Sequence, residues 1–349
     1  MPTIVGAASA LPEHVYSQAE LRQATASLFA ERLPDLEETL RIFDHSRIER
    51  RQLMRPLDWY ARPRTTVERS RIYLDEGGAL AREAARRCLA RADVAPREID
   101  RVLWVSSTGI AAPTPDAYLI NELGLRPSTI RVPIWGLGCA GGAAGLGRAF
   151  EFCRAFPESL TLVVALETCS LTLVDADATK RNVVAASLFA DGAAAALVAG
   201  DATGRTGAEI LRTRSHLFPD SYQVMGWNVV DEGLGLVLSP KLPAIVKREL
   251  PALAAELRRE AKLERFQFYL THPGGARVID AYQQALQLTD EDLALTAEVL
   301  RDHGNVSSVS VLLVLERWLA GQGIHGGQGL LSAFGPGFSA ELLLVSDVR

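Results

Sequence analysis

The stretch "PIWGLGCAGGAAGLGRAFEFC", residues 133–153, places one cysteine, Cys139, between glycines where an apolar run turns into a helical pattern. A related stretch, "DHGNVSSVSVLLVLERW" at residues 302–318, has Asn305 in the corresponding position. Each follows a "DAY" tripeptide, 23 residues after Asp116 in the first case and 25 residues after Asp280 in the second. Each is also followed by a similar segment near the end of its half, "SLFADGAAAALVAG" (187–200) or "SAFGPGFSAELLLV" (332–345). Three matches in one order predict an internal duplication in which Cys139 and Asn305 are equivalent.

The pattern of apolar residues predicts an α/β fold. Five runs are apolar without alternation, which is typical of strands covered on both faces: "RVLWVSST" (101–108), "LTLVVAL" (160–166), "AAAALVAG" (193–200), "FQFYLTH" (266–272) and "ELLLVSDV" (341–348). Apolar residues recur at helical spacing in residues 77–94 and, around Pro251, in residues 242–263. We therefore expect two related α/β halves, residues 1–204 and 205–349, packed face to face. Cys139 and Asn305 would each begin a buried helix near a pseudo-twofold axis.

Composition excludes several classes of function. The chain has 349 residues, 48% of them hydrophobic, and a net charge of −5, which argues against nucleic acid or an anionic membrane as partner. The N-terminus lacks the pattern of a signal peptide, and no apolar run is long enough to span a bilayer. The four cysteines form neither a disulfide framework nor a zinc-binding pattern, so we expect a cytoplasmic protein without a metal site.

The residues around Cys139 suit a nucleophile. Unpaired N–H groups at a helix N-terminus stabilise a thiolate, so we expect a lowered pKa for Cys139. A buried cysteine that only packs is the alternative. His272 ends a predicted strand in "LTHPGG", and in the duplicated fold its loop faces Cys139 and Asn305, which gives a Cys, His, Asn combination used in nucleophilic catalysis. His303 would lie next to this site, whereas the other histidines are interpreted as structural or surface residues: His14, His45, His216 and His325.

Six ordered motifs resemble the chalcone synthase family, the type III polyketide synthases of the thiolase superfamily, over nearly the whole chain. They are "GCAGG" (138–142), "LFADGAAAALV" (188–198), "MGWNVVDEGLGLVLSPKLP" (225–243), "THPGGARVID" (271–280), "HGNVSS" (303–308) and "FGPGFSAE" (334–341). A papain-type protease uses the same three residue types, but its cysteine motif and disulfides are missing here.

The resemblance implies a homodimer with a five-layered αβαβα thiolase fold and iterative decarboxylative Claisen condensation. Cys139 would take an acyl group from an acyl-CoA starter, with His272 as the base that keeps the thiol ionised. His272 and Asn305 would then bind the thioester carbonyl of malonyl-CoA, so that decarboxylation leaves a stabilised enolate. The enolate attacks the acyl group on Cys139, and no metal or organic cofactor is required.

The resemblance also places residues of the substrate cavity and of the CoA site. Phe189 matches the family's gatekeeper phenylalanine, and Leu236 replaces a second phenylalanine of the plant enzymes. The other expected cavity residues are Ser107, Cys169, Thr172, Gly335, Pro336, Gly337 and Ala112, the last at a position that reaches across the dimer interface in the plant enzymes. Within the basic segment "RIERRQLMRP" and the helix before it, the expected contacts to the CoA phosphates are Arg41, His45 and Arg50, with Arg47 and Arg51 as further candidates. Ordinary core packing and a solvated charge cluster are the respective alternatives.

Two enzyme alternatives remain open at the level of sequence. A β-ketoacyl carrier-protein synthase III shares the fold and the three residues but condenses once, whereas "HPGG" and "FGPG" favour the polyketide synthase. Within the family, the chain resembles the bacterial branch, some of whose members make a naphthalene from malonyl-CoA alone. The small residues Ala112 and Leu236 favour a roomier cavity and therefore a fatty acyl-CoA starter, with an alkylpyrone or alkylresorcinol as product.

Overall fold

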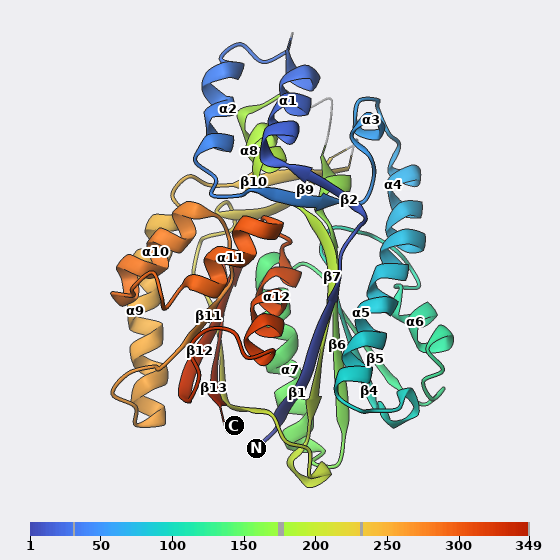
Figure 1. The fold of residues 1–349 in the computed structure, drawn as a ribbon, viewed down its shortest axis with the longest axis vertical. Coiled ribbons are helices and arrows are strands. Elements are labelled where there is room, and N and C mark those ends of the chain that lie inside the picture. Colours follow the sequence, from blue (N-terminus) through green and yellow to red (C-terminus); the bar gives the residue numbers. More distant parts are fainter. Residues whose placement is uncertain (31, 174–177, 231–232, 348–349) are drawn as a thin grey trace.

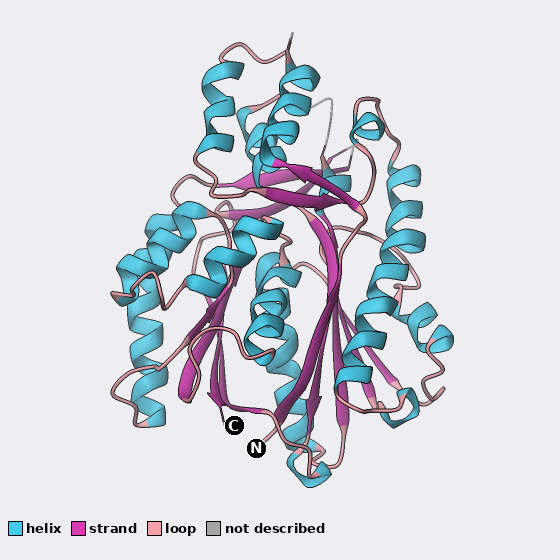
Figure 2. Ribbon diagram, in the orientation of Figure 1, coloured by secondary structure: helices cyan, strands magenta, loops and turns pink. Residues whose placement is uncertain are grey.

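The computed structural model describes residues 1–30, 32–173, 178–230 and 233–347, and its described part is built around a nine-stranded sheet (Figures 1 and 2). The strand order in this sheet is β11-β12-β13-β8-β1-β7-β6-β4-β5, and two antiparallel two-stranded sheets, β2-β3 and β9-β10, lie outside it. The strands are β1 (Thr3–Ala10), β2 (His14–Ser17), β3 (Arg50–Leu53), β4 (Arg101–Val105), β5 (Ile130–Ile134), β6 (Leu160–Thr168), β7 (Asp191–Ala199), β8 (Ala208–Leu217), β9 (Met225–Val230), β10 (Gly233–Leu238), β11 (Tyr269–Thr271), β12 (Gly327–Gly335) and β13 (Ser339–Asp347).

The helices form layers on both faces of this sheet (Figure 1). Helices α7 and α12 lie at the centre, α5 covers the strands of the N-terminal half, and α9 and α10 cover those of the C-terminal half. The helices are α1 (Gln18–Phe29), α2 (Leu36–Asp44), α3 (Leu57–Tyr60), α4 (Thr66–Ile72), α5 (Gly78–Arg91), α6 (Asp116–Glu122), α7 (Gly141–Ala155), α8 (Lys180–Leu188), α9 (Leu242–Ala261), α10 (Ala276–Leu286), α11 (Ala294–His303) and α12 (Ser308–Leu319). Short helical turns are η1 (Tyr73–Gly77), η2 (Pro96–Glu98), η3 (Gly138–Ala140), η4 (Cys169–Thr172) and η5 (Asp201–Thr203).

The two ends of the sheet repeat one topology. In the order β4-β6-β7-β1, the first pair is parallel and the next two pairs are antiparallel, and β11-β12-β13-β8 follows the same rule. The two sets meet through only two residue pairs between β1 and β8, Thr3 with Glu209 and Ile4 with Ala208. The αβαβα fold with related halves is confirmed, while the boundary between residues 204 and 205 stays a prediction.

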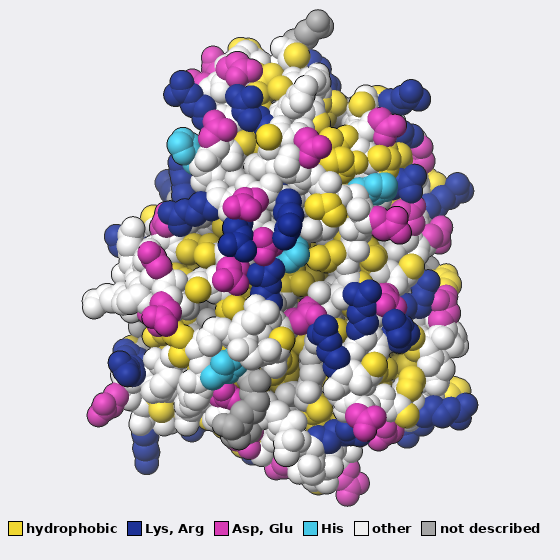
Figure 3. Space-filling model, viewed as in Figure 1, with side chains coloured by type: hydrophobic (Ala, Val, Ile, Leu, Met, Phe, Trp, Pro, Cys, Tyr) yellow, Lys and Arg dark blue, Asp and Glu magenta, His cyan; other side chains and the backbone are white. Residues whose placement is uncertain are grey.

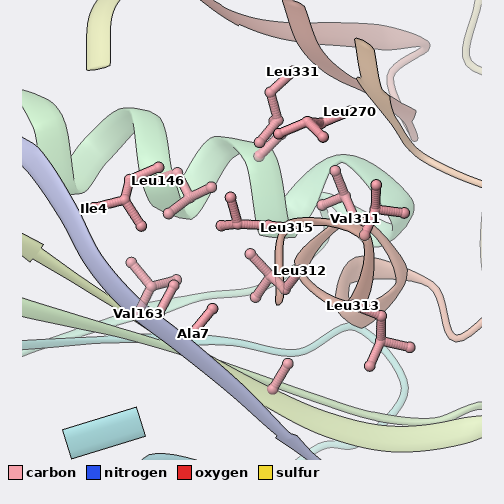
Figure 4. Packing of buried hydrophobic residues seen from close by; sticks show 14 of the residues in the cluster. Ile4, Ala7, Leu146, Val163, Leu270, Val311, Leu312, Leu313, Leu315 and Leu331 are labelled. Carbon is pink, nitrogen blue, oxygen red and sulfur yellow. The ribbon is translucent and has the colours of Figure 1, made fainter. Parts of the chain in front are cut away.

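Alternate residues of the apolar strands belong to different cores, as expected for strands covered on both faces. Leu162 and Val164 of β6 pack in the core with α5, whereas Val163 packs in the central core with α7 and α12. Figure 4 shows this central core, where side chains of β1, β6, β11 and β12 surround those of α7 and α12. The predicted strand at residues 266–272 is shorter than expected: the ladder with β12 covers Tyr269–Thr271, and the flanking residues Gln267, Phe268 and His272 add backbone hydrogen bonds to β12.

A glycine sets the distance between the two central helices. A Cβ atom on Gly142 of α7 would lie 2.2 Å from the carbonyl oxygen of Ser308, the first residue of α12. Real Cβ atoms essentially never come this close, so glycine is required for the approach. The glycine at position 142 therefore lets a second backbone approach the helix that follows Cys139.

In the described ranges, no helix is long and apolar enough to cross a bilayer. On the face shown in Figure 3, acidic and basic side chains are interspersed and form no extended field of one sign.

Candidate active site

Cys139 and Asn305 meet where the central helices begin. Cys139 lies in η3, directly before α7, and Asn305 lies three residues before α12. The Cys139 sulfur is 3.9 Å from both Oδ1 and Nδ2 of Asn305, and both side chains are almost completely buried. The internal duplication thus brings its two equivalent residues into contact.

The loop that carries His272 joins this pair. His272 directly follows β11, and its backbone N–H donates to the Ser332 carbonyl of β12 at 2.8 Å. Two residues further along, the Gly274 carbonyl accepts a hydrogen bond of 3.2 Å from Nδ2 of Asn305. The Asn305 amide therefore contacts both the sulfur of Cys139 and the "HPGG" loop. Neither ring nitrogen of His272 has a hydrogen-bond partner among the residues that the structure describes, although the side chain is only 3% exposed.

Both titratable members of the site are uncharged at neutral pH. Burial raises the pKa of the Cys139 thiol to about 12, with a hydrogen bond from Ser307 acting against it and the nearby Glu167 carboxylate acting with it. The expected lowering of this pKa is therefore wrong for the free protein, because desolvation outweighs the helix terminus. Burial also lowers the pKa of His272 to about 3. The thiol and the imidazole are thus both neutral in the free protein.

A buried carboxylate that the sequence analysis did not single out lies close to Cys139. Glu167, near the end of β6, is fully buried. One of its oxygens accepts hydrogen bonds from the Ser107 N–H (3.1 Å) and the Thr108 hydroxyl (2.7 Å), and the other accepts from the hydroxyls of Ser307 (3.3 Å) and Ser308 (2.6 Å). The carboxylate thereby ties the loop after β4 to the beginning of α12. The available signal was a charged residue inside an otherwise apolar strand, since glutamate is rarely buried without partners.

A cavity of about 620 Å³ lies in this part of the molecule, although Cys139, His272 and Asn305 are not among the residues that line it. It includes four of the expected cavity residues, Cys169, Thr172, Phe189 and Leu236. Most of the remaining lining is apolar and comes from α1, β3, α3, α8, β9 and β10: Leu21, Ala24, Leu28, Leu53, Leu57, Ala185, Ala186, Trp227 and Leu234. The polar lining includes Arg51, Tyr60 and Ser170.

Phe189 links the cavity to Asn305. The N–H of Asn305 donates to the Leu188 carbonyl, and the Ala190 N–H donates to the Asn305 carbonyl, both at 2.9 Å. Phe189 therefore lies between the two hydrogen bonds that hold Asn305. Its side chain lines the cavity, where its ring centroid lies 6.2 Å from the ring centroid of Trp227.

Arg51 fixes this segment from the other side. Its guanidinium donates to the carbonyls of Phe189 (2.7 Å) and Ala186 (2.6 Å) and to Oε1 of Gln18 (3.1 Å). The side chain is 1% exposed and also packs against Gly304, where an added Cβ would lie 2.7 Å from its Cδ. Arg51 therefore holds residues 186–189 in place, and this buried role differs from the expected contact to CoA phosphates.

The structure places the other five expected cavity residues outside the lining of this cavity. The Ser107 hydroxyl accepts the Gly138 N–H at 2.9 Å, which holds the turn before Cys139. Ala112 is exposed in the loop between β4 and α6. Gly335, Pro336 and Gly337 lie against η3 and β8, and Pro336 would meet a Cβ on Gly138 at 2.7 Å.

Comparisons with known proteins agree with this architecture. The model of the N-terminal domain of chalcone and stilbene synthases matches residues 2–202, and that of the C-terminal domain matches residues 209–349. The chain belongs to the chalcone and stilbene synthase family of type III polyketide synthases.

Relatives in this family match the chain over its length. A putative chalcone synthase of Bacillus subtilis is 37% identical, with 99% of each chain covered. The 1,3,6,8-tetrahydroxynaphthalene synthase of Streptomyces peucetius is 36% identical over 97% of this chain and 91% of its own. The crystal structure of the Streptomyces coelicolor naphthalene synthase superimposes with a TM-score of 0.94 at 31% identity, covering 99% of both chains.

Type III polyketide synthases are acyltransferases that catalyse decarboxylative condensation, so the chain is an enzyme of this class. The relatives do not favour a carrier-protein synthase that condenses once. Among the described residues, no cluster of His, Cys, Asp or Glu is arranged to hold a metal ion.

The cationic residues expected at the CoA site of this polyketide synthase differ in their surroundings. Arg41 in α2 and His45 directly after it are exposed. Arg50 is also exposed but forms an ion pair of 3.5 Å with Asp302, and Arg47 pairs with Asp280 at 2.8 Å. A phosphate would therefore compete with a carboxylate at Arg50 and Arg47.

Proposed function

We propose that the chain primes Cys139 with a fatty acyl group from acyl-CoA and extends it with malonyl-CoA by repeated decarboxylative condensation. The contact of the Asn305 amide with both the Cys139 sulfur and the His272 loop carries this proposal. In this proposal Cys139 is the nucleophile and the neutral side chains of Asn305 and His272 are the hydrogen-bonding groups, with the cavity reached past Phe189, which is bridged to Asn305.

In the first step, the Cys139 sulfur attacks the thioester carbon of the starter. Because the thiol is neutral in the free protein, His272 takes its proton as the S–C bond forms and not before. The same proton leaves with the CoA thiolate when the C–S bond to CoA breaks. The acyl group then remains on Cys139 with His272 neutral again.

In the second step, the malonyl thioester carbonyl accepts hydrogen bonds from Nδ2 of Asn305 and from an N–H of His272. A neutral imidazole has one N–H to donate, and the low pKa keeps His272 in this form. Loss of carbon dioxide moves negative charge onto the carbonyl oxygen, where two fixed donors in a water-poor site stabilise it. The resulting enolate carbon attacks the acyl thioester, and the cysteine leaves as a thiolate ready to receive the longer chain.

The cavity supports a fatty acyl starter. Leucine and alanine side chains of α1, β3, α3 and β10 line it, and its volume of about 620 Å³ lies within the usual range for a small-molecule site. An alkyl tail would bury apolar surface here, at about 0.8 kcal/mol for each methylene. A pyrone or resorcinol would then form from the keto groups near Cys139. One relative, Pks18 of Mycobacterium tuberculosis, is named for α-pyrone synthesis and is 31% identical over 99% of this chain.

We also propose that the enzyme acts as a cytoplasmic homodimer. Large apolar side chains are exposed around the loop that contains Ala112 and along the edge strand β5: Ile110, Tyr118, Ile130 and Trp135. A second copy covering this face would bury these side chains and bring Ala112 against its partner. CoA thioesters are the substrates in this scheme, with Arg41, His45 and Arg50 as the proposed phosphate contacts, and it uses no metal or organic cofactor.

The test is product analysis by mass spectrometry with hexanoyl- to palmitoyl-CoA plus malonyl-CoA, beside malonyl-CoA alone. Acyl-primed polyketides are the expected products. A polyketide from malonyl-CoA alone, with no acyl-primed product, would refute the starter and point to naphthalene synthesis as in the Streptomyces relatives. Activity with malonyl carrier protein but not with malonyl-CoA would refute the proposed extender.

A further inference from the structure

The cavity has one wall of hydrogen-bonded hydroxyl groups that the scheme above does not use. Tyr60 of α3 and Ser170 of η4 both line the cavity, and their oxygens are 2.6 Å apart. The Ser170 hydroxyl in turn bonds Oδ2 of Asp191, the first residue of β7, which is completely buried. A continuous chain of hydrogen bonds thus leads from the cavity to a carboxylate inside the protein.

The direction of each hydrogen bond follows from the carboxylate. An ionised carboxylate only accepts, so the Ser170 hydroxyl donates to Asp191, and its oxygen is left to accept the proton of the Tyr60 phenol. The carboxylate also accepts the N–H groups of Met54 (2.6 Å) and Ser170 (2.7 Å). The Tyr60 oxygen accepts the Arg55 N–H at 3.2 Å and keeps a second acceptor position. A hydroxyl bound in the cavity can donate to that position.

Burial of the inner end of this chain of hydrogen bonds favours proton uptake there. The charged groups that act on Asp191 or Tyr60 are the guanidinium of Arg51 in β3 and the side chain of Arg55, while Asp191 in turn raises the pKa of the Cys169 thiol in η4. Burial raises the pKa of Asp191 to about 6, against its hydrogen bonds and Arg51. Burial also raises the pKa of Tyr60 well above its usual value, so the phenol stays neutral. A proton entering at Tyr60 must therefore be passed on at once.

We propose that Tyr60, Ser170 and Asp191 form a proton relay that accepts the enol proton of the polyketide when it cyclises to a lactone. The proposal rests on the proposed function. The enol oxygen attacks the thioester carbon on Cys139, forming the ring C–O bond and breaking the C–S bond to cysteine. The enol proton moves to Tyr60, the Tyr60 proton moves to Ser170, and the Ser170 proton moves to Asp191. Cys139 leaves as a thiolate, and Asp191 later loses the proton to solvent. Tyr60 is thus the residue that touches the substrate, and Asp191 acts through Ser170.

Two nearly isosteric substitutions interrupt the relay. Ser170→Ala removes the middle hydroxyl but keeps the backbone N–H bond to Asp191. Tyr60→Phe removes the outer hydroxyl. Tyr16→Phe is the matched control, because the Tyr16 hydroxyl also accepts a backbone N–H of this segment, from Leu57 at 3.2 Å, but Tyr16 does not line the cavity.

The measurement is the ratio of cyclised pyrone to open-chain acid formed from hexanoyl-CoA and malonyl-CoA, quenched early and followed between about pH 5 and pH 9. The native ratio should fall as pH decreases through the pKa of Asp191, near 6, because a carboxyl group that already carries a proton cannot take up the proton that the relay delivers. Both relay variants should lower the ratio at neutral pH at least about tenfold and lose this pH dependence, while condensation continues. Tyr16→Phe should keep the native ratio and profile.

An unchanged ratio and pH profile in Ser170→Ala and Tyr60→Phe, with condensation intact, would overturn the relay alone. An equal fall of the pyrone-to-acid ratio in Tyr16→Phe would also overturn the relay. The fall would then come from a displacement of α3 and not from the loss of a relay hydroxyl. A native protein that consumes no malonyl-CoA would refute the proposed function and the relay with it.

Discussion

Replacing Gly142 with alanine should displace Asn305 from its working position. The new Cβ would lie 2.2 Å from the Ser308 carbonyl oxygen, so the start of α12 must move by about 1 Å to restore ordinary contact. Asn305 lies three residues before that point and contacts Cys139. A misplacement of about 1 Å in a catalytic group lowers the rate about 100-fold, and overpacking a core costs about 1–3 kcal/mol of stability.

The assay compares malonyl-CoA decarboxylation and thermal unfolding for Gly142→Ala and Gly147→Ala. Gly147 lies in the same helix, but its added Cβ would meet only Thr213 at 3.8 Å. Alanine there improves helix propensity by up to about 1 kcal/mol, so this control should keep its activity and be as stable as the native protein or more stable. If Gly142→Ala decarboxylates malonyl-CoA at the native rate, the close approach of α7 and α12 does not position Asn305.

Three further changes test other parts of the site. Cys139→Ala should abolish chain extension in product analysis, and full retention of product would contradict the proposed mechanism. Glu167→Gln should lower the pKa of Cys139, because it removes a negative charge, while the rotatable hydroxyls of Ser307 and Ser308 can accept hydrogen bonds from the new amide. Alkylation of Cys139 by iodoacetamide should then begin at lower pH than in the native protein. An unchanged pH profile of alkylation would contradict this prediction. Arg51→Lys should lower the melting temperature, because an ammonium group cannot reach all three acceptors of the guanidinium at once. Each buried carbonyl left without a hydrogen bond costs about 1–3 kcal/mol of stability. An unchanged melting temperature would show that these hydrogen bonds do not stabilise the segment.

The strands and the internal repeat could be predicted because they depend on local patterns. Uninterrupted apolar runs identified strands covered on both faces. The shared "DAY" motifs and the similar segments at residues 187–200 and 332–345 identified Cys139 and Asn305 as equivalent positions of the repeat. The edge strand β5 was not predicted, because its residues alternate between exposed and half-buried and give no continuous apolar run. The run at residues 266–272 was predicted as one strand, whereas the ladder of β11 covers only Tyr269–Thr271, with further backbone hydrogen bonds to β12 at Gln267, Phe268 and His272.

Charged side chains were harder to place than apolar ones. Arg50 and Arg51 are neighbours in one basic segment, yet Arg50 is exposed and Arg51 is buried against Gly304, because successive residues of β3 point to opposite sides. Sequence does not tell which of the two faces inward. The same holds for the pKa of Cys139, which depends on how completely η3 is covered and not on the helix that follows.

Tyr60 shows a second limit of sequence reasoning. Its partner Ser170 is 110 residues away, and no repeat or spacing connects α3 with η4. Only the packing of both elements around the cavity brings the two hydroxyls together.

The position of β1 has a consequence for how the chain folds during synthesis. This first strand lies in the interior of the sheet, between β7 and β8, so both of its neighbours are made about 190 residues later. At about 5–20 residues per second, a ribosome needs roughly 10–40 s to supply them. Until then β1 has no strand to pair with, so Ile4 and Ala7 cannot pack into the central core to which they belong in the folded protein. β1 is thus paired long after it is synthesised, and long-range pairing of this kind makes folding slow.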